Sequence, residues 1–214
     1  MPHRREFDAV IFDLDGTLID TESVALATGR AAFAAVGHPV EDVFLHGLVG
    51  RDLPTSDALI RAHRPLIDLD ALHLHWHDAF ERQVMTDLQL KAGAAELLGL
   101  LVHPCALATS SGREGAHYKL RLVGIERHFR HVITLDDVRL PKPAPEPFLL
   151  AAERLGVDPA RCVAFEDSET GAEAAYAAGM CVVQVPDFLA TEGRFAHHVA
   201  PDLLSGARGV GLIA

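Results

Sequence analysis

The chain has 214 residues, a net charge of −11 at pH 7 and a sequence pI of about 5.5. This length allows one good core and a smaller second module, and the acidic balance argues against a nucleic-acid groove. No apolar run approaches the length needed to span a membrane, and the opening MPHRREF is too short for a signal peptide. The three cysteines lack metal-type spacing and are typical of small buried side chains in a reducing compartment. We therefore expect a cytoplasmic monomer with no nucleic-acid or membrane partner.

Short runs rich in β-branched residues alternate with helical patterns along most of the chain. The predicted strands are AVIFD (9–13), PCALATSS (104–111), HVITLDD (131–137), RCVAFED (161–167) and CVVQVPD (181–187). The predicted helices between them lie at 92–101, 115–124, 146–156 and 168–179. Such alternation predicts βαβ units, and hence an α/β fold with a Rossmann-like parallel sheet covered on both faces.

The stretch from residue 19 to residue 89 has a different character. It contains no comparable strand pattern and is predicted to form three or four helices. It falls between the first strand and all the others, so it is interpreted as a helical module inserted into the α/β core. The expected domains are therefore a core of residues 1–18 and 90–214 and an inserted module of residues 19–89.

Polar residues follow successive predicted strands, at the point where each strand ends. They are Asp13, Asp15, Thr109, Ser110, Ser111, Lys142, Glu166 and Asp167. Each residue taken alone also fits a turn or a helix cap. In open parallel sheets, however, ligands bind beyond the carboxyl ends of the strands, so these side chains should converge. Together they supply a carboxylate nucleophile, a second carboxylate, donors for phosphoryl oxygens and ligands for a hard divalent ion.

Four segments give a resemblance to a known family. They are FDLDGTLIDTE (12–22), LATSS (107–111), KPAPEPF (142–148) and FEDSETGAEAAYAAGM (165–180). They resemble the haloacid dehalogenase superfamily, and within it the helical-cap phosphatases and β-phosphoglucomutase-like enzymes. The resemblance implies that residues 19–89 form the cap, that Mg²⁺ is the cofactor and that a small phosphorylated metabolite is the substrate, with sugar or polyol phosphates favoured.

The same resemblance assigns roles to residues. Asp13 is expected to attack phosphorus and form an aspartyl phosphate, while Asp15 protonates the leaving oxygen and later activates water. Thr109 and Lys142 are expected to contact the phosphoryl group. The expected Mg²⁺ ligands are Asp13, the backbone carbonyl of Asp15, Asp167 and, as a direct or supporting group, Glu166. Substrate contacts are expected from Thr17, Ser110 and, in the cap, Arg51.

Two other functions stay open. A β-phosphoglucomutase shares almost every core motif with this chain. The family resemblance implies, however, that such a mutase typically has a bulky aliphatic residue at the position of Thr17 and a lysine in the cap. Residues 19–89 contain no lysine, which favours hydrolysis. The second alternative is a non-catalytic regulatory module that keeps the fold, which the intact set of charged residues disfavours. The histidines in HLHWHD (73–78) are left out of the expected site, because histidines at helical spacing are more often solvated than metal-bound.

Overall fold

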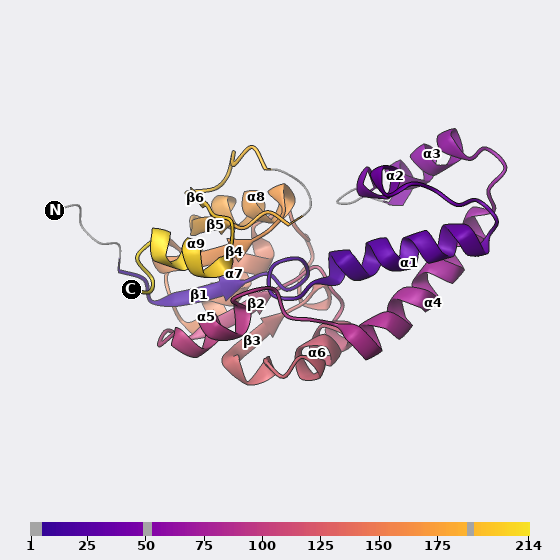
Figure 1. Ribbon diagram of the computed structural model, residues 1–214. Coiled ribbons are helices and arrows are strands. Elements are labelled where there is room, and N and C mark those ends of the chain that lie inside the picture. Colours follow the sequence, from indigo (N-terminus) through magenta and orange to yellow (C-terminus); the bar gives the residue numbers. More distant parts are fainter. Residues whose placement is uncertain (1–5, 49–52, 188–190) are drawn as a thin grey trace. The chain divides into compact units, whose positions relative to one another are not determined.

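The structure is a computed structural model that describes residues 6–48, 53–187 and 191–214. Its centre is a six-stranded sheet with the order β3-β2-β1-β4-β5-β6, in which every neighbouring pair is parallel (Figure 1). The strands are β1 (Ala9–Phe12), β2 (Cys105–Ala108), β3 (Phe129–Ile133), β4 (Cys162–Glu166), β5 (Cys181–Gln184) and β6 (His198–Val199). The predicted α/β class with a Rossmann-like parallel sheet is therefore confirmed.

The helices of the α/β part follow the strands in the predicted alternation. They are α5 (Ala94–Leu100), α6 (Arg113–Leu122), α7 (Glu146–Leu155), α8 (Glu169–Ala177) and α9 (Leu203–Gly209). The strand expected over 131–137 is wrong in its second half, because Leu135–Asp137 forms a 3₁₀ turn. A reciprocal capping box between Thr134 and Asp137 satisfies the backbone there and ends the strand. The short β6 and the helix α9 were not predicted.

Both faces of the sheet are covered, as a parallel sheet requires. On one face, Ile11 and Ala164 belong to an apolar cluster with Phe148 of α7 and three buried alanines of α8. On the other face, Phe12 stacks on Phe165 at a ring-centroid distance of 5.0 Å, and α9 packs beside β5 and β6. Alternate residues of β1 therefore point into separate cores, which fixes the strand's register and the direction of the residues that follow it.

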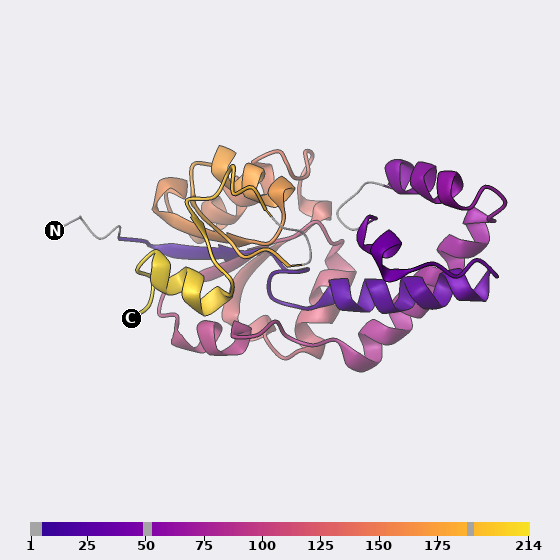
Figure 2. The same ribbon diagram turned by 45° about the horizontal axis from the view of Figure 1, so that its top comes forward.

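The chain divides into two compact units, one of Met1–Asp20 with Gln89–Ala214 and one of Thr21–Leu88. The second unit holds α1 (Thr21–Ala35), α2 (Asp42–His46), α3 (Leu53–His63) and α4 (Leu69–Asp87). Helices α1 and α4 lie side by side along most of their lengths (Figure 2). Phe33, Ile60 and Leu72 belong to a buried core within this unit. Within the described residues, no helix is long and apolar enough to cross a bilayer.

Candidate active site

The carboxyl ends of β1 and β4 bring the acidic residues together. Phe12 of β1 is in register with Phe165 of β4, and the backbone N–H of Asp13 donates to the Phe165 carbonyl at 2.9 Å. The residues just beyond this pair, Asp13 and Glu166, therefore leave the sheet side by side. Both side chains are almost completely buried. This arrangement places two carboxylates in one dry space, which needs compensating positive charge.

Lys142 supplies that charge, and we call Lys142, Asp13 and Glu166 the Lys142 cluster. The Lys142 Nζ donates to Asp13 Oδ1 at 2.6 Å and to Glu166 Oε1 at 2.5 Å. Only 5% of the lysine side chain is exposed. The other oxygen of Glu166 accepts hydrogen bonds from the backbone N–H and the hydroxyl of Ser168. Glu166 is thus held at both oxygens, whereas Asp13 has one oxygen bound by the lysine.

Burial and charge pull the pKa values of this cluster in different directions. Burial raises the pKa of Asp13 to about 7; the Lys142 ammonium opposes the rise, and the negative charges of Glu166 and Asp15 add to it. Burial tends to lower the pKa of Lys142, but the charges of Asp13 and Glu166 outweigh it and raise that pKa above its ordinary value. The ammonium is therefore retained at neutral pH, and Asp13 needs further positive charge to stay ionised.

Asp167 lies close enough to share a cation with this cluster. One ligand oxygen each from Asp13, Glu166 and Asp167 can be chosen so that all lie within 4.8 Å of one another. A Cβ on Gly16 would lie 2.5 Å from Asp167 Oδ2, and a Cβ on Gly171 would overlap Glu166 Oε1. Both glycines therefore leave the space that the carboxylates occupy. Clustered carboxylate oxygens are the ligands that hard divalent cations prefer, so the residues present fit Mg²⁺.

Asp15 belongs to a second group of side chains, which we call the Lys119 cluster (Lys119, Asp15 and Ser111). The Lys119 Nζ donates to Asp15 Oδ1 at 2.5 Å and to Ser111 Oγ at 2.8 Å. The Ser111 hydroxyl donates in turn to Asp15 Oδ2 at 2.7 Å. Sequence reasoning missed Lys119, because a lysine on a helix after a strand is normally solvated.

The other predicted site residues differ in where the structure puts them. Thr109 is buried beyond β2, and its Oγ1 accepts a hydrogen bond from the Ser111 N–H at 3.1 Å. Ser110, the predicted substrate contact, is exposed, and Ser111 is the serine that reaches Asp15. Thr17 is buried and donates to Asp167 Oδ1 at 2.9 Å. Arg51 lies outside the described residues.

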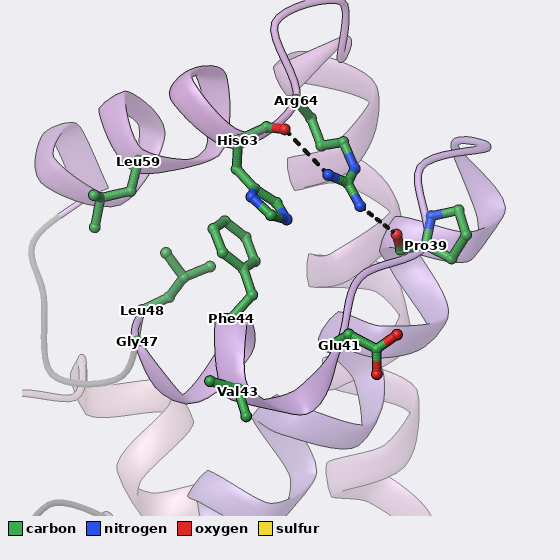
Figure 3. Close-up of a pocket in the computed structure, with 9 residues that line it drawn as sticks. All are labelled: Pro39, Glu41, Val43, Phe44, Gly47, Leu48, Leu59, His63 and Arg64. Atoms are coloured by element: carbon green, nitrogen blue, oxygen red, sulfur yellow. Dashed lines mark hydrogen bonds between the residues drawn. The ribbon is translucent and has the colours of Figure 1, made fainter.

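The helical unit contains a pocket of about 670 Å³ between α2 and α3 (Figure 3). Its wall is mainly apolar, and the rings of Phe44 and His63 stack there with their centroids 4.2 Å apart. Arg64 also lines it, and its two Nη groups donate to the Pro39 and His63 carbonyls. Elsewhere in the unit, His73 pairs with Asp57 at 2.9 Å. The acidic group of Asp13, Glu166 and Asp167 is the metal-type cluster found among the described residues.

Comparison with known proteins agrees with this geometry. A family model for haloacid dehalogenase-like hydrolases matches residues 7–179, and the chain belongs to this family. The fructose-1-phosphate phosphatase YqaB of Escherichia coli K12 is 32% identical over 187 residues, which cover 84% of this chain and 96% of that protein. The phosphorylated carbohydrates phosphatase of Thermotoga maritima is 34% identical over 179 residues, covering 81% and 82%. Within its family, the enzyme is a phosphatase.

Solved structures show the same fold. A HAD family hydrolase from Deinococcus radiodurans with bound phosphate and sodium has a TM-score of 0.80 and 28% identity, with 98% of this chain and 99% of that chain covered. A putative β-phosphoglucomutase from Thermotoga maritima has a TM-score of 0.77 and 30% identity, with coverage of 90% and 94%. The predicted membership of the haloacid dehalogenase superfamily is confirmed.

Proposed function

We propose that this phosphatase hydrolyses the phosphomonoesters of small sugars or polyols, with Mg²⁺ as cofactor and Asp13 as the nucleophile. The observation that carries the proposal is the separation of two aspartates that follow one strand. Asp13 is paired with a buried lysine, and Asp15 is paired with another lysine beside solvent. One carboxylate is thus equipped to attack phosphorus and the other to exchange protons.

In the first step, an Asp13 carboxylate oxygen attacks the phosphorus of the substrate. The bond from phosphorus to the ester oxygen breaks, and that oxygen takes a proton from Asp15, which leaves an aspartyl phosphate and a free alcohol. The buried Lys142 ammonium stabilises the negative charge on the phosphoryl oxygens as it develops. Thr109, buried at the neighbouring strand end, is positioned by its hydrogen bond with Ser111 to serve as a further donor.

In the second step, water replaces the alcohol. Asp15, now ionised, accepts a proton from the water as its oxygen bonds to phosphorus, and the bond from phosphorus to Asp13 breaks. Inorganic phosphate leaves, and both aspartates return to their starting states. Because Asp15 keeps part of its side chain exposed, water can approach it without a change in the buried Lys142 cluster.

Asp13 and Asp167 would hold the Mg²⁺ ion, together with the backbone carbonyl of Asp15. When bound, the ion supplies positive charge next to the phosphoryl oxygens. Glu166 already accepts hydrogen bonds at both oxygens, so we assign it mainly to holding Lys142 in place. Thr17 orients Asp167 through its hydroxyl, which is a different role from the substrate contact expected from the sequence.

The substrate class rests on the two relatives whose names specify sugar phosphates. We further infer that the enzyme works as a monomer in the cytoplasm, where its three free, buried cysteines would remain reduced. A β-phosphoglucomutase is the second candidate, because one similar solved structure carries that name in its title. The absence of lysine from residues 19–89 favours hydrolysis over the mutase, which must hold a second phosphate.

A panel of sugar and polyol phosphates separates these functions. We expect purified enzyme with Mg²⁺ to release inorganic phosphate from some members, including fructose 1-phosphate, and Asp13→Asn to lower that rate by about 10⁴-fold or more. Given β-glucose 1-phosphate and a bisphosphate primer, the enzyme should yield phosphate or nothing. Conversion to glucose 6-phosphate without phosphate release would make the mutase correct. No turnover of any member or of an activated aryl phosphate would favour the non-catalytic module.

A further inference from the structure

Lys119 is an unusual residue for the surface of a helix. It lies in the last turns of α6, yet only 9% of it is exposed. Its neighbours Ala116 and Leu120 are also buried, so the lysine stem runs along the apolar side of the helix. Burying an ammonium group costs free energy unless charged and polar partners replace the lost water. Asp15 and Ser111 are those partners, and both belong to the candidate site.

The three side chains form a closed ring of hydrogen bonds. Asp15 Oδ1 accepts from Lys119, Asp15 Oδ2 accepts from Ser111, and Ser111 Oγ accepts from Lys119. A carboxylate with one partner can rotate about that contact, whereas a carboxylate held at both oxygens cannot. The ring therefore fixes the plane of the Asp15 carboxyl group as well as its position.

We propose that Lys119 is a positioning residue, which holds the Asp15 carboxyl group in the orientation needed for proton transfer to and from the substrate. The inference rests on the proposed function, since it acts through the acid and base role of Asp15. The exposed fractions of the side chains support it: 11% for Lys119 and 31% for Asp15. The lysine supports the carboxylate from the protein side and leaves the open side to the leaving oxygen or to water.

The lysine content of the chain supports a specific role. The sequence contains only three lysines, at positions 91, 119 and 142, against sixteen arginines. Cations on the surface of this protein are therefore almost always arginine. Each lysine pairs instead with an aspartate at 2.5–2.6 Å, and none of the three side chains is more than 23% exposed. A compact ammonium fits between the Ser111 hydroxyl and the Asp15 carboxylate, where a planar guanidinium requires more room.

If the ion pair of Lys119 with Asp15 only stabilised the fold, removing the lysine would lower the activity toward all substrates equally. A positioning role predicts a loss that differs between substrates. Lys119→Met removes the charge and keeps most of the stem. If Lys119 positions the acid, the loss should depend on how much protonation the leaving group needs. The specificity constant kcat/KM reports the steps up to cleavage of the ester bond, so it isolates the step in which Asp15 acts as an acid.

The first experiment measures kcat/KM for two substrates in one enzyme preparation. They are 2,4-dinitrophenyl phosphate, whose leaving group needs no proton, and the best sugar phosphate of the panel. Lys119→Met should lower kcat/KM by about 30–100-fold for the sugar phosphate and by less than about 5-fold for the aryl phosphate. The ratio of the two values does not depend on the folded fraction. Arg121→Met, an exposed cation on the same helix, is the matched control and should change neither value appreciably.

The second experiment repeats Lys119→Met in an Asp15→Asn background. If the lysine acts through Asp15, the double variant should hydrolyse the sugar phosphate at the rate of Asp15→Asn alone, within about 2-fold. Turnover of both substrates by the wild type tests the phosphatase itself. With that turnover present, equal losses for the two substrates, or an undiminished loss in the Asp15→Asn background, would overturn the role of Lys119 and leave the phosphatase standing.

Discussion

The Lys142 cluster and the Lys119 cluster each contain a lysine–aspartate ion pair, but the two pairs differ in their exposure to solvent. Each places a lysine Nζ within 2.6 Å of an aspartate that follows β1. In the Lys142 cluster the side chains are no more than 8% exposed, whereas Asp15 is 31% exposed. The difference matches the two tasks: the nucleophile must keep its charge away from water, and the proton donor must reach water and substrate.

The charge balance of the two clusters also differs. When Asp15 is ionised, as it is between the two proposed steps, its charge and that of Lys119 cancel, and the third member of the cluster is the neutral Ser111. Lys142 faces two carboxylates, and Asp167 adds a third nearby, which leaves two negative charges in excess. Buried like charges at this spacing are unfavourable unless a cation joins them. The comparison therefore predicts that the side chains that bind a divalent ion belong to the acidic group of Asp13, Glu166 and Asp167, and that the side chains of the Lys119 cluster bind none.

Among the tests of this comparison, removal of divalent cations gives the largest expected effect and tests the difference in charge directly. Dialysis against a chelator should lower the rate by about 10³-fold or more. Without the ion, the excess negative charge disfavours the ionised form of Asp13 and repels the phosphate of the substrate. Titration with Mg²⁺ should restore the rate. Circular dichroism should show that the fold is retained without the ion, since none of the proposed Mg²⁺-binding residues belongs to the apolar cores. Full activity after thorough chelation would contradict the prediction.

Lys142→Ala should have the next largest effect. It leaves two buried carboxylates without their shared cation, so we expect kcat to fall by about 10²–10³-fold and the free energy of unfolding to fall by about 3–5 kcal/mol. Lys142→Arg should not restore the rate, because the guanidinium does not fit two partners at 2.5–2.6 Å in a buried space. An alanine variant with the wild-type kcat would show that the Lys142 cluster is structural only.

The pH dependence of that variant has a definite sign. The pKa of Lys142 is raised above its ordinary value of 10.5, so the ammonium contributes its full stability below that pH. The contribution is lost only as the pH rises through the higher value of the folded state. The difference in unfolding free energy between the wild type and Lys142→Ala should therefore not shrink from about pH 8 to about pH 10, because the variant also lacks the ammonium that opposes the rise in the pKa of Asp13. A difference that disappears within this range would contradict the pairing.

The sequence was sufficient to predict the Lys142 cluster because each member follows a recognisable strand or motif. Asp13 and Glu166 end two strands whose apolar runs are unmistakable, and neighbouring parallel strands bring their carboxyl ends together. Lys142 was predicted from its place in the loop after the strand expected at 131–137, and the resemblance carried by the motif KPAPEPF gave it a role. The fold followed from the alternation of strand and helix, and the elements that were not predicted are short: β6 has two residues and α9 has seven.

The Lys119 cluster could not be predicted in the same way. Lys119 and Asp15 are separated by 104 positions, and no local pattern distinguishes this lysine from a solvated one. Its direction depends on the rotation of α6 about its axis, which only the packing of that helix determines. Thr17 gives a similar lesson: its polarity was recognised, but its partner, Asp167, is 150 positions away. Contacts between a turn and a distant segment require the folded chain.

The smallest predicted effect concerns Thr17, which connects the turn after β1 to the proposed metal site. Thr17→Val keeps the shape of this buried side chain and removes the hydroxyl that donates to Asp167 Oδ1. We expect the Mg²⁺ concentration for half-maximal activity to rise by about 10-fold, while kcat at saturating Mg²⁺ changes by less than about 3-fold. Thr17→Ser keeps the hydroxyl and should resemble the wild type. Lys119→Met should change the Mg²⁺ requirement by less than about 2-fold, since Lys119 contacts the side chains of Asp15 and Ser111 and none of the side chains proposed to bind the ion. If Thr17→Val left the Mg²⁺ titration unaltered, or if Lys119→Met shifted it as strongly, the two clusters would not divide metal binding and proton transfer between them.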